Sequence, residues 1–244
     1  MSIYAIADLH LSFENPVVPD KWEDIKEYKS MSIFGEHWQM HYKKIYNNWI
    51  NLISRDDVVL IPGDISWATN LDEMKADIDF LEKLPGKKIF IRGNHDYWWK
   101  GINGLRTALP DDFYLLQNDS VILQDIAIAG TRAWTPPNSY QFSAKDRKIY
   151  DRELIRLELS LKSIKSIKNV EKIIVMLHYM PTNEEHEYNQ MIALLEKYNV
   201  DICIYGHLHG FDSHQIRLEG EKWGIKFKLV SSDFLQFKPC LILP

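Results

Sequence analysis

Aspartate, histidine and asparagine side chains, which can bind metal ions, recur at short spacings along this 244-residue chain. Asp8-Leu9-His10 places two of them two residues apart, and His207-Leu208-His209 repeats that spacing. Residues two apart in a strand point to the same side, so each pair can reach one ion. With three single residues, these pairs make up the predicted metal ligands: Asp8, His10, Asp64, Asn94, His178, His207 and His209. Oxygen and nitrogen ligands without cysteine suit borderline or hard cations such as Mn, Fe, Zn or Mg.

The three single ligands bring the predicted set to seven, which suits two ions. Asp64 follows Gly63, which lets the backbone turn sharply and could place the carboxylate between two cations. Asn94 offers a neutral oxygen, and His178 supplies an imidazole nitrogen.

Five predicted strands end close to these ligands. The apolar runs cover residues 2–7, 58–62, 88–91, 172–177 and 201–205. Ligands collect at the carboxyl ends of strands in α/β sheets, so we expect the ligand side chains to meet at one edge.

Helical segments and hairpins fill the intervals between these strands. Apolar residues recur at helical spacing over residues 38–52, 71–84 and 150–164. Two pairs of short runs, 119–123 with 126–130 and 215–218 with 225–231, predict β-hairpins and therefore mixed sheets. The chain shows no domain linker, so we expect one α/β domain over residues 1–244.

Composition excludes several broad classes of protein. The formal net charge is -5, which argues against a basic footprint for nucleic acid or an anionic membrane. No apolar stretch has the length of a membrane span, and the N-terminus lacks a signal segment. The two cysteines, Cys203 and Cys240, form no metal-binding or disulfide pattern. We therefore expect a cytoplasmic protein, and no protein partner is evident.

The polar motifs, in this order, resemble those of the calcineurin-like metallophosphoesterase family. The family pattern is D-x-H, G-D, G-N-H-[DE], a separate H, and G-H-x-H. The chain matches it with Asp8-Leu9-His10, Gly63-Asp64, Gly93-Asn94-His95-Asp96, His178 and Gly206-His207-Leu208-His209. The extended motifs are similar to a bacterial branch of predicted phosphohydrolases.

The resemblance implies a fold and a role for each motif residue. The fold would be two mixed β-sheets packed as a sandwich flanked by helices, in four αββα layers. One metal would be held by Asp8, His10, Asp64 and His209, and the other by Asp64, Asn94, His178 and His207, with Asp64 bridging. The catalytic histidine maps onto His95. Asp96 could orient His95, or it could cap a helix predicted to begin at Tyr97.

The implied reaction is hydrolysis of a phosphomonoester or phosphodiester of a small molecule or nucleotide. Two divalent or trivalent cations, about 3.5–4 Å apart, would activate a hydroxide for in-line attack and clamp the phosphoryl oxygens. His95 would stabilise the developing charge or protonate the leaving oxygen.

Two branches of the family fit the motifs less well. Protein phosphatases extend the second motif to G-D-x-V-D-R-G, whereas this chain has Gly63-Asp64-Ile65-Ser66-Trp67-Ala68. Lipid-A pathway pyrophosphatases carry Arg at the position of His95. Two alternatives stay open: a metal-dependent nuclease, and a non-catalytic scaffold of the same fold that binds a protein. The acidic net charge argues against the first, and the complete motif set argues against the second.

Residues outside the motifs are candidates for substrate contacts. Arg132 follows a predicted strand and could grip a phosphate, while Trp98 could form a pocket wall or part of the core. Residues 11–50 exceed the length of a minimal connection, so they form either a partial lid that selects the substrate or a packed helix pair. His37 and His41, one helical turn apart, are interpreted as part of a solvated helix face.

Overall fold

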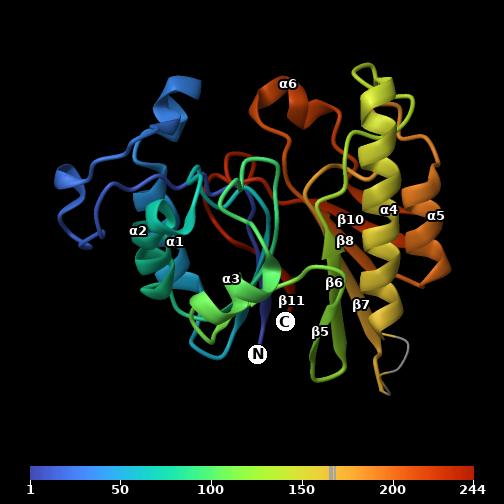
Figure 1. Ribbon diagram of the computed structural model, residues 1–244, viewed down its shortest axis with the longest axis horizontal. Coiled ribbons are helices and arrows are strands. Elements are labelled where there is room, and N and C mark those ends of the chain that lie inside the picture. The colour runs from blue at the N-terminus through green and yellow to red at the C-terminus, as the bar shows by residue number, and fades with distance from the viewer. Residues whose placement is uncertain (165–166, 168) are drawn as a thin grey trace.

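Two β-sheets pack face to face in the computed structural model, which describes residues 1–164, 167 and 169–244 (Figure 1). The first sheet has the order β11-β1-β2-β3-β4 and contains β1 (Ile3–Ala5), β2 (Val58–Pro62), β3 (Lys87–Ile91), β4 (Phe113–Leu115) and β11 (Cys240–Leu243). The second has the order β5-β6-β7-β8-β10-β9 and contains β5 (Ser120–Leu123), β6 (Ile126–Thr131), β7 (Lys172–Leu177), β8 (Ile202–Tyr205), β9 (Gly220–Lys222) and β10 (Ile225–Leu229).

Both sheets are mixed, as the sequence predicts. Strands β1 to β4 run parallel, and β11 is antiparallel to β1. In the second sheet β6, β7, β8 and β10 run parallel, while β5 and β9 are antiparallel at the two edges. The carboxyl ends of the parallel strands therefore meet along one edge of the sandwich.

Helices cover the outer face of each sheet. The described helices are α1 (His41–Leu52), α2 (Leu71–Glu82), α3 (Ile102–Ala108), α4 (Ala144–Ile164), α5 (Gln190–Lys197) and α6 (Gly210–Gln215), with short 3-10 turns η1 (Trp22–Asp24), η2 (Met31–Phe34) and η3 (Glu36–Trp38). Helices α1 and α2 lie outside the first sheet, and α4 and α5 lie outside the second (Figure 1). In the described part of the chain, none of the helices is both long and apolar enough to cross a membrane.

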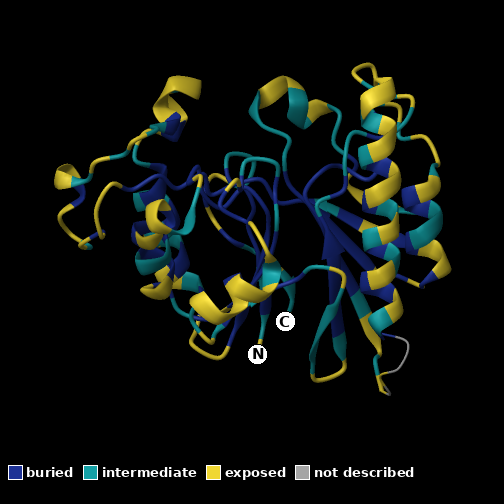
Figure 2. Cartoon of the chain, viewed as in Figure 1, coloured by how far each residue is buried: buried dark blue, intermediate teal, exposed yellow. Residues whose placement is uncertain are grey.

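Alternating side chains of the central strands build three hydrophobic layers. In β2, Val59 and Ile61 pack toward the α1 and α2 side, whereas Val58 and Leu60 pack between the two sheets. This alternation follows from the two-residue period of a strand. The central strands are buried throughout, and the helices show a buried stripe facing them (Figure 2). The α/β sandwich flanked by helices is thereby confirmed.

One predicted hairpin has a different first strand. The sequence predicts a strand over residues 215–218, but α6 ends at Gln215 and β10 pairs instead with β9 (Gly220–Lys222). Trp223 and Gly224 form a two-residue turn with φ of 53° and 71°. With a turn of only two residues, the strand that pairs with β10 must end directly before the turn. This excludes residues 215–218.

Asp77 is a buried carboxyl group that makes folding sensitive to pH. It accepts hydrogen bonds from the Phe13 amide at 2.9 Å and from the Ser66 hydroxyl, and so joins α2 to two motif loops. Burial raises the pKa of Asp77 to about 7. The unfolded chain ionises near the ordinary value of 3.8 while the folded chain stays protonated, so stability falls as pH rises from about 4 to about 7.

We expect the Asp77→Asn variant to lose this pH dependence. Its melting temperature should rise relative to the wild type as pH increases from about 4 to about 7, because asparagine cannot ionise. The measurement is thermal unfolding of chelated protein across this range, with Asp79→Asn on the same helix as the control. A constant difference between Asp77→Asn and wild type at every pH would contradict the prediction.

Candidate metal centre

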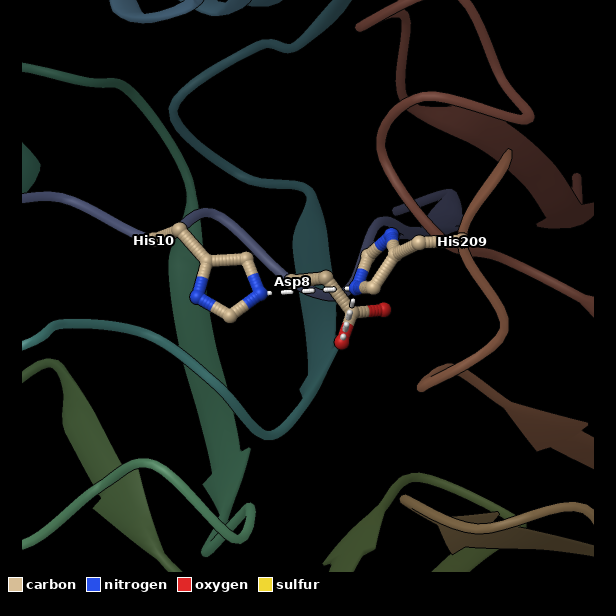
Figure 3. A group of neighbouring side chains, drawn as sticks. All are labelled: Asp8, His10 and His209. Atoms are coloured by element: carbon tan, nitrogen blue, oxygen red, sulfur yellow. Dashed lines mark hydrogen bonds and ion pairs between the residues drawn. The ribbon is translucent and has the colours of Figure 1, made fainter. Parts of the chain in front are cut away.

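Side chains that could bind metal ions converge in two groups from distant parts of the chain. Asp8, His10 and His209 form one group, and Asp64, His178 and His207 form the other. In each group, the donor atoms lie within 4.8 Å of one another. Figure 3 shows that the first group joins the loop after β1 to the loop after β8. The structure thus brings together residues that the sequence separates by about 200 positions.

In the first group, imidazole nitrogens face each other beside a carboxylate (Figure 3). His10 Nε2 lies 3.4 Å from His209 Nε2, and His209 Nε2 lies 3.4 Å from Asp8 Oδ1. Asp8 and His10 are buried, whereas His209 is partly exposed. Ring nitrogens and a carboxylate oxygen aimed at one small volume form a donor set that suits a divalent cation.

The second group adds an amide oxygen to its imidazole and carboxylate donors. His178 Nε2 lies 2.7 Å from Asn94 Oδ1 and 3.4 Å from Asp64 Oδ2. His178 Nδ1 lies 3.0 Å from the Pro62 carbonyl oxygen. That carbonyl can only accept a hydrogen bond, so Nδ1 carries a proton, and Nε2 is the nitrogen that could bind a metal ion beside Asn94 and Asp64.

Asp64 lies between the two groups. Its Oδ2 is 3.4 Å from His178 Nε2 and 3.8 Å from His10 Nε2. Its Oδ1 accepts a hydrogen bond from the His95 amide at 2.8 Å. The Asp64 carboxylate therefore lies within about 4 Å of an imidazole nitrogen from each group.

The backbone is strained at four of the predicted ligands. Asp8, His10, Asp64 and His207 have φ of 60°, 46°, 51° and 69°, in the left-handed region. Such conformations cost about 1–3 kcal/mol each outside glycine and concentrate at functional sites. Gly206 permits one of the close approaches, because a Cβ there would lie 2.5 Å from Asp8 Oδ2. The chain therefore holds these side chains together at a cost in folding stability.

The Asp96 carboxylate binds the backbone of the ligand loops. Asp96 is fully buried and accepts hydrogen bonds from the amides of Gly93 at 2.7 Å and Asp64 at 2.9 Å. The amides of Ile65 and Ser66 and the indole Nε1 of Trp98 complete its donor set. Asp96 thus ties the Asp64 loop to the Asn94 loop. The prediction that a helix begins at Tyr97 is wrong, because the next helix, α3, begins at Ile102.

Asp233 is a residue of the centre that the sequence analysis missed. It follows β10, its side chain is 2% exposed, and its Oδ1 lies 2.9 Å from His209 Nδ1. The Gly210 amide donates to Oδ2 at 2.9 Å, and His214 Nε2 lies 3.4 Å from the same oxygen. A carboxylate behind a ligand histidine fixes its tautomer and ring orientation. The signal was a polar run, Ser231-Ser232-Asp233, at the end of an apolar strand.

We expect Asp233→Ala to weaken metal binding by about 10–100-fold, because His209 loses the group that orients it. Asp233→Asn should lie between Ala and wild type, since its amide oxygen can still accept from Nδ1. Competition with a chromogenic chelator measures the affinity. Equal affinity in all three proteins would show that His209 needs no such support.

His95 lies beside the two groups and above an indole ring. Its ring centroid is 4.3 Å from that of Trp67 and 5.8 Å from that of His10. Tyr97 Oη lies 3.5 Å from His95 Nδ1. Burial lowers the pKa of His95, although the Asp64 carboxylate opposes this effect. A neutral imidazole at this position can donate a hydrogen bond toward the metal site.

The side chains of the two residues predicted to contact substrate pack against other groups of the protein. Trp98 is 2% exposed and packs in the core, where its Nε1 donates to Asp96. Arg132 Nη2 lies 3.7 Å from the buried Glu153 carboxylate, and its guanidinium stacks on Trp134 at 4.5 Å. The core position of Trp98 favours the structural alternative. The substrate role of Arg132 stays a prediction.

The predicted solvated face is wrong for His41, whereas His37 is exposed as predicted. His41 is 1% exposed, and its Nε2 lies 2.9 Å from the Leu9 carbonyl oxygen. His37 lies in η3 and lines a pocket beside His10 and His95. The reason is that a turn separates the two histidines, since Met40 adopts φ of 48° just before α1 begins.

Comparisons with known proteins agree with the motifs. A sequence model of the family described as calcineurin-like phosphoesterase matches residues 1–211. The chain belongs to this family. It is therefore a metal-dependent phosphoester hydrolase, and the resemblance inferred from the motifs is confirmed.

Several relatives of this calcineurin-like phosphoesterase carry a substrate in their names. The chain is 27% identical over 233 residues to a UDP-2,3-diacylglucosamine hydrolase of Blochmanniella pennsylvanica, covering 88% of this chain and 82% of that protein. It is 22% identical over 256 residues to a UDP-2,3-diacylglucosamine hydrolase of Vibrio cholerae, covering 97% and 92%. An uncharacterised protein of Methanocaldococcus jannaschii is 31% identical over 129 residues, covering 50% of this chain and 66% of that protein.

Proposed function

We propose that the chain is a binuclear phosphoesterase that hydrolyses a small-molecule or nucleotide phosphoester. The observation that carries the proposal is the position of Asp64, whose Oδ2 lies 3.4 Å from His178 Nε2 and 3.8 Å from His10 Nε2. Two adjacent donor groups that share a carboxylate fit two cations. One ion is held by Asp8, His10, Asp64 and His209, and the other by Asp64, Asn94, His178 and His207.

The donor chemistry suits Mn, Fe or Zn, with Mg as an alternative. Imidazole favours the borderline transition metals, while carboxylate and amide oxygens also accept harder ions. No cysteine is among the predicted ligands. When bound, the two ions supply an activated hydroxide and neutralise the charge on the phosphoryl oxygens.

Residues of the chain position the substrate and move the proton. His95 is the catalytic residue beside the centre and donates a hydrogen bond or a proton to the leaving oxygen. Asp96 is a positioning residue, because its bonds to the Asp64 and Gly93 amides hold the ligand loops together. Residues 11–50 act as a partial lid, because four of them, Met31, Phe34, His37 and Trp38, line the pocket beside His10.

The relatives support a small molecule over a polymer. Their name, UDP-2,3-diacylglucosamine hydrolase, denotes a nucleotide-linked small molecule. The net charge of -5 does not favour a nucleic-acid substrate. Retention of every motif residue argues against the scaffold alternative.

The test is hydrolysis of p-nitrophenyl phosphate and bis-p-nitrophenyl phosphate by the purified protein. Each is assayed as isolated, after chelation, and after addition of Mn, Fe, Zn or Mg, with metal content measured in parallel. We expect turnover that chelation abolishes and that returns with about two ions per chain. Full activity with one ion per chain would contradict the binuclear centre. Absence of turnover in protein that holds two ions would contradict the phosphoesterase function.

A further inference from the structure

Two pockets of different chemistry open beside the metal centre. The aromatic pocket, of about 300 Å³, is lined by Met31, Phe34, Trp38 and Trp67 together with His95 and His209. The polar pocket, of about 200 Å³, is lined by Thr135, Ser139, Gln141, Thr182, Asn183 and Ser213 among others. Both volumes suit a group of several non-hydrogen atoms, so each pocket can hold one part of a small ligand.

One short loop forms a wall of both pockets. His207 and Leu208 line the polar pocket, whereas His209 and Gly210 line the aromatic pocket. His209 belongs to the first donor group and His207 to the second. Each pocket therefore adjoins one of the two donor groups.

The aromatic pocket suits a flat or aliphatic group. Among the described residues that line it there is no Asp, Glu, Lys or Arg. Phe34 is 56% exposed although it is a large apolar side chain, so a bound group could cover it. Indole and phenyl faces favour flat or aliphatic groups over hydrated ones.

The polar pocket suits a hydroxylated group and disfavours a second phosphate. Its described lining residues include one carboxylate, Glu184, and no Lys or Arg. A carboxylate accepts hydrogen bonds from hydroxyl groups but repels an additional anion. In the described structure, the side chain of Gln141 is exposed and makes no hydrogen bond, so its amide can bind a ligand hydroxyl.

We infer that the substrate is a phosphodiester that joins an apolar alcohol to a hydroxylated alcohol. The inference rests on the proposed phosphoesterase function and specifies its substrate. The apolar group occupies the aromatic pocket, the hydroxylated group occupies the polar pocket, and the phosphate lies between them at the two donor groups.

The position of His95 selects which ester bond breaks. His95 lines the aromatic pocket, so its ring N–H passes a proton to the departing oxygen of the apolar alcohol, and a proton lost by the attacking water replaces it. The bond from phosphorus to that oxygen breaks as a bond from phosphorus to the water oxygen forms. The products are the free apolar alcohol and the phosphomonoester of the hydroxylated alcohol.

The test uses two diesters that differ only in hydroxyl groups. Glyceryl p-nitrophenyl phosphate and propyl p-nitrophenyl phosphate release the same leaving group, and p-nitrophenyl phosphate represents the monoester. We expect manganese-loaded enzyme to have a kcat/KM for the glyceryl ester about fivefold or more above that for the propyl ester. Both diesters should exceed the monoester.

Matched variants assign each preference to its pocket. Gln141→Ala should lower kcat/KM for the glyceryl ester about fivefold and leave the propyl ester unchanged, while Gln215→Ala leaves both unchanged. Phe34→Ala should lower kcat/KM for both diesters about tenfold. Ile33→Ala is its control, because Ile33 is 72% exposed and does not line either pocket.

Failure of this inference is distinguishable from failure of the proposed function. A kcat/KM for p-nitrophenyl phosphate above that of both diesters would overturn the diester substrate while metal-dependent hydrolysis stands. Equal kcat/KM of wild type, Phe34→Ala and Gln141→Ala on both diesters would overturn the two pockets as substrate sites. Absence of turnover with all three compounds in metal-loaded protein would overturn both.

Discussion

Asp64→Asn is expected to lower kcat/KM for p-nitrophenyl esters by about 10³-fold or more and to reduce the metal content below two ions per chain. The physical reason is that one carboxylate serves both donor groups, with Oδ2 3.4 Å from His178 Nε2 and 3.8 Å from His10 Nε2. Asparagine keeps the shape but removes the charge that would bind the two proposed cations, and the electrostatic loss amounts to several kcal/mol. Elemental analysis and steady-state kinetics measure the two effects.

Asp72→Asn provides the control for a lost aspartate. Asp72 lies on α2, and its side chain is 87% exposed. This variant should keep both its metal ions and its activity. Two tightly bound ions and near wild-type turnover in Asp64→Asn would refute the bridging role.

The ends of the apolar runs were the most informative feature of the sequence for predicting the fold and the site. Strand β2 (Val58–Pro62) and strand β7 (Lys172–Leu177) have the predicted bounds, because each is a buried apolar run that stops abruptly at polar residues. The edge strands β4 and β11 were not predicted. Both are apolar, but runs of three and four residues are too short for the sequence to distinguish a strand from other buried structure.

The rule that ligands lie just after the ends of strands explains which site residues were predicted and which were missed. Asp8, Asp64 and His178 each follow a strand at the shared edge, and the structure places them within the two donor groups. Asp233 also follows a strand, but β10 was interpreted only as half of a hairpin. The parallel pairing of β10 with β8 brings Asp233 to the metal edge, and a sequence does not reveal which strands become neighbours.

The pocket residues within residues 11–50 were the least predictable part of the site. Residues 11–50 contain both core and lining side chains, and the same residue types serve both purposes. Trp22 and Trp38 are buried, yet only Trp38 lines the aromatic pocket. A hydrophobic residue indicates that its side chain is buried, but not whether it packs in the core or lines a pocket. That depends on the path of the irregular loop, which contacts such as the isolated bridge between Phe13 and Glu27 determine.

His95→Ala is expected to lower kcat by about 10²-fold or more while the metal content stays at the wild-type value. His95 stands beside the donor groups, and its ring lies near the rings of Trp67, Tyr97 and His10. Its ring can therefore be removed without dismantling the centre. Kinetics with p-nitrophenyl phosphate and elemental analysis test these two statements together.

The leaving group distinguishes proton donation by His95 from general support of the pocket. If His95 supplies a proton, its loss should matter more for phenyl phosphate than for p-nitrophenyl phosphate, because phenolate is the more basic leaving group and needs protonation more. If His95 only shapes the aromatic pocket above Trp67, both esters should lose the same factor, and KM should rise instead. An equal loss for the two esters would therefore assign His95 to binding, whereas a larger loss for phenyl phosphate assigns it to the chemical step.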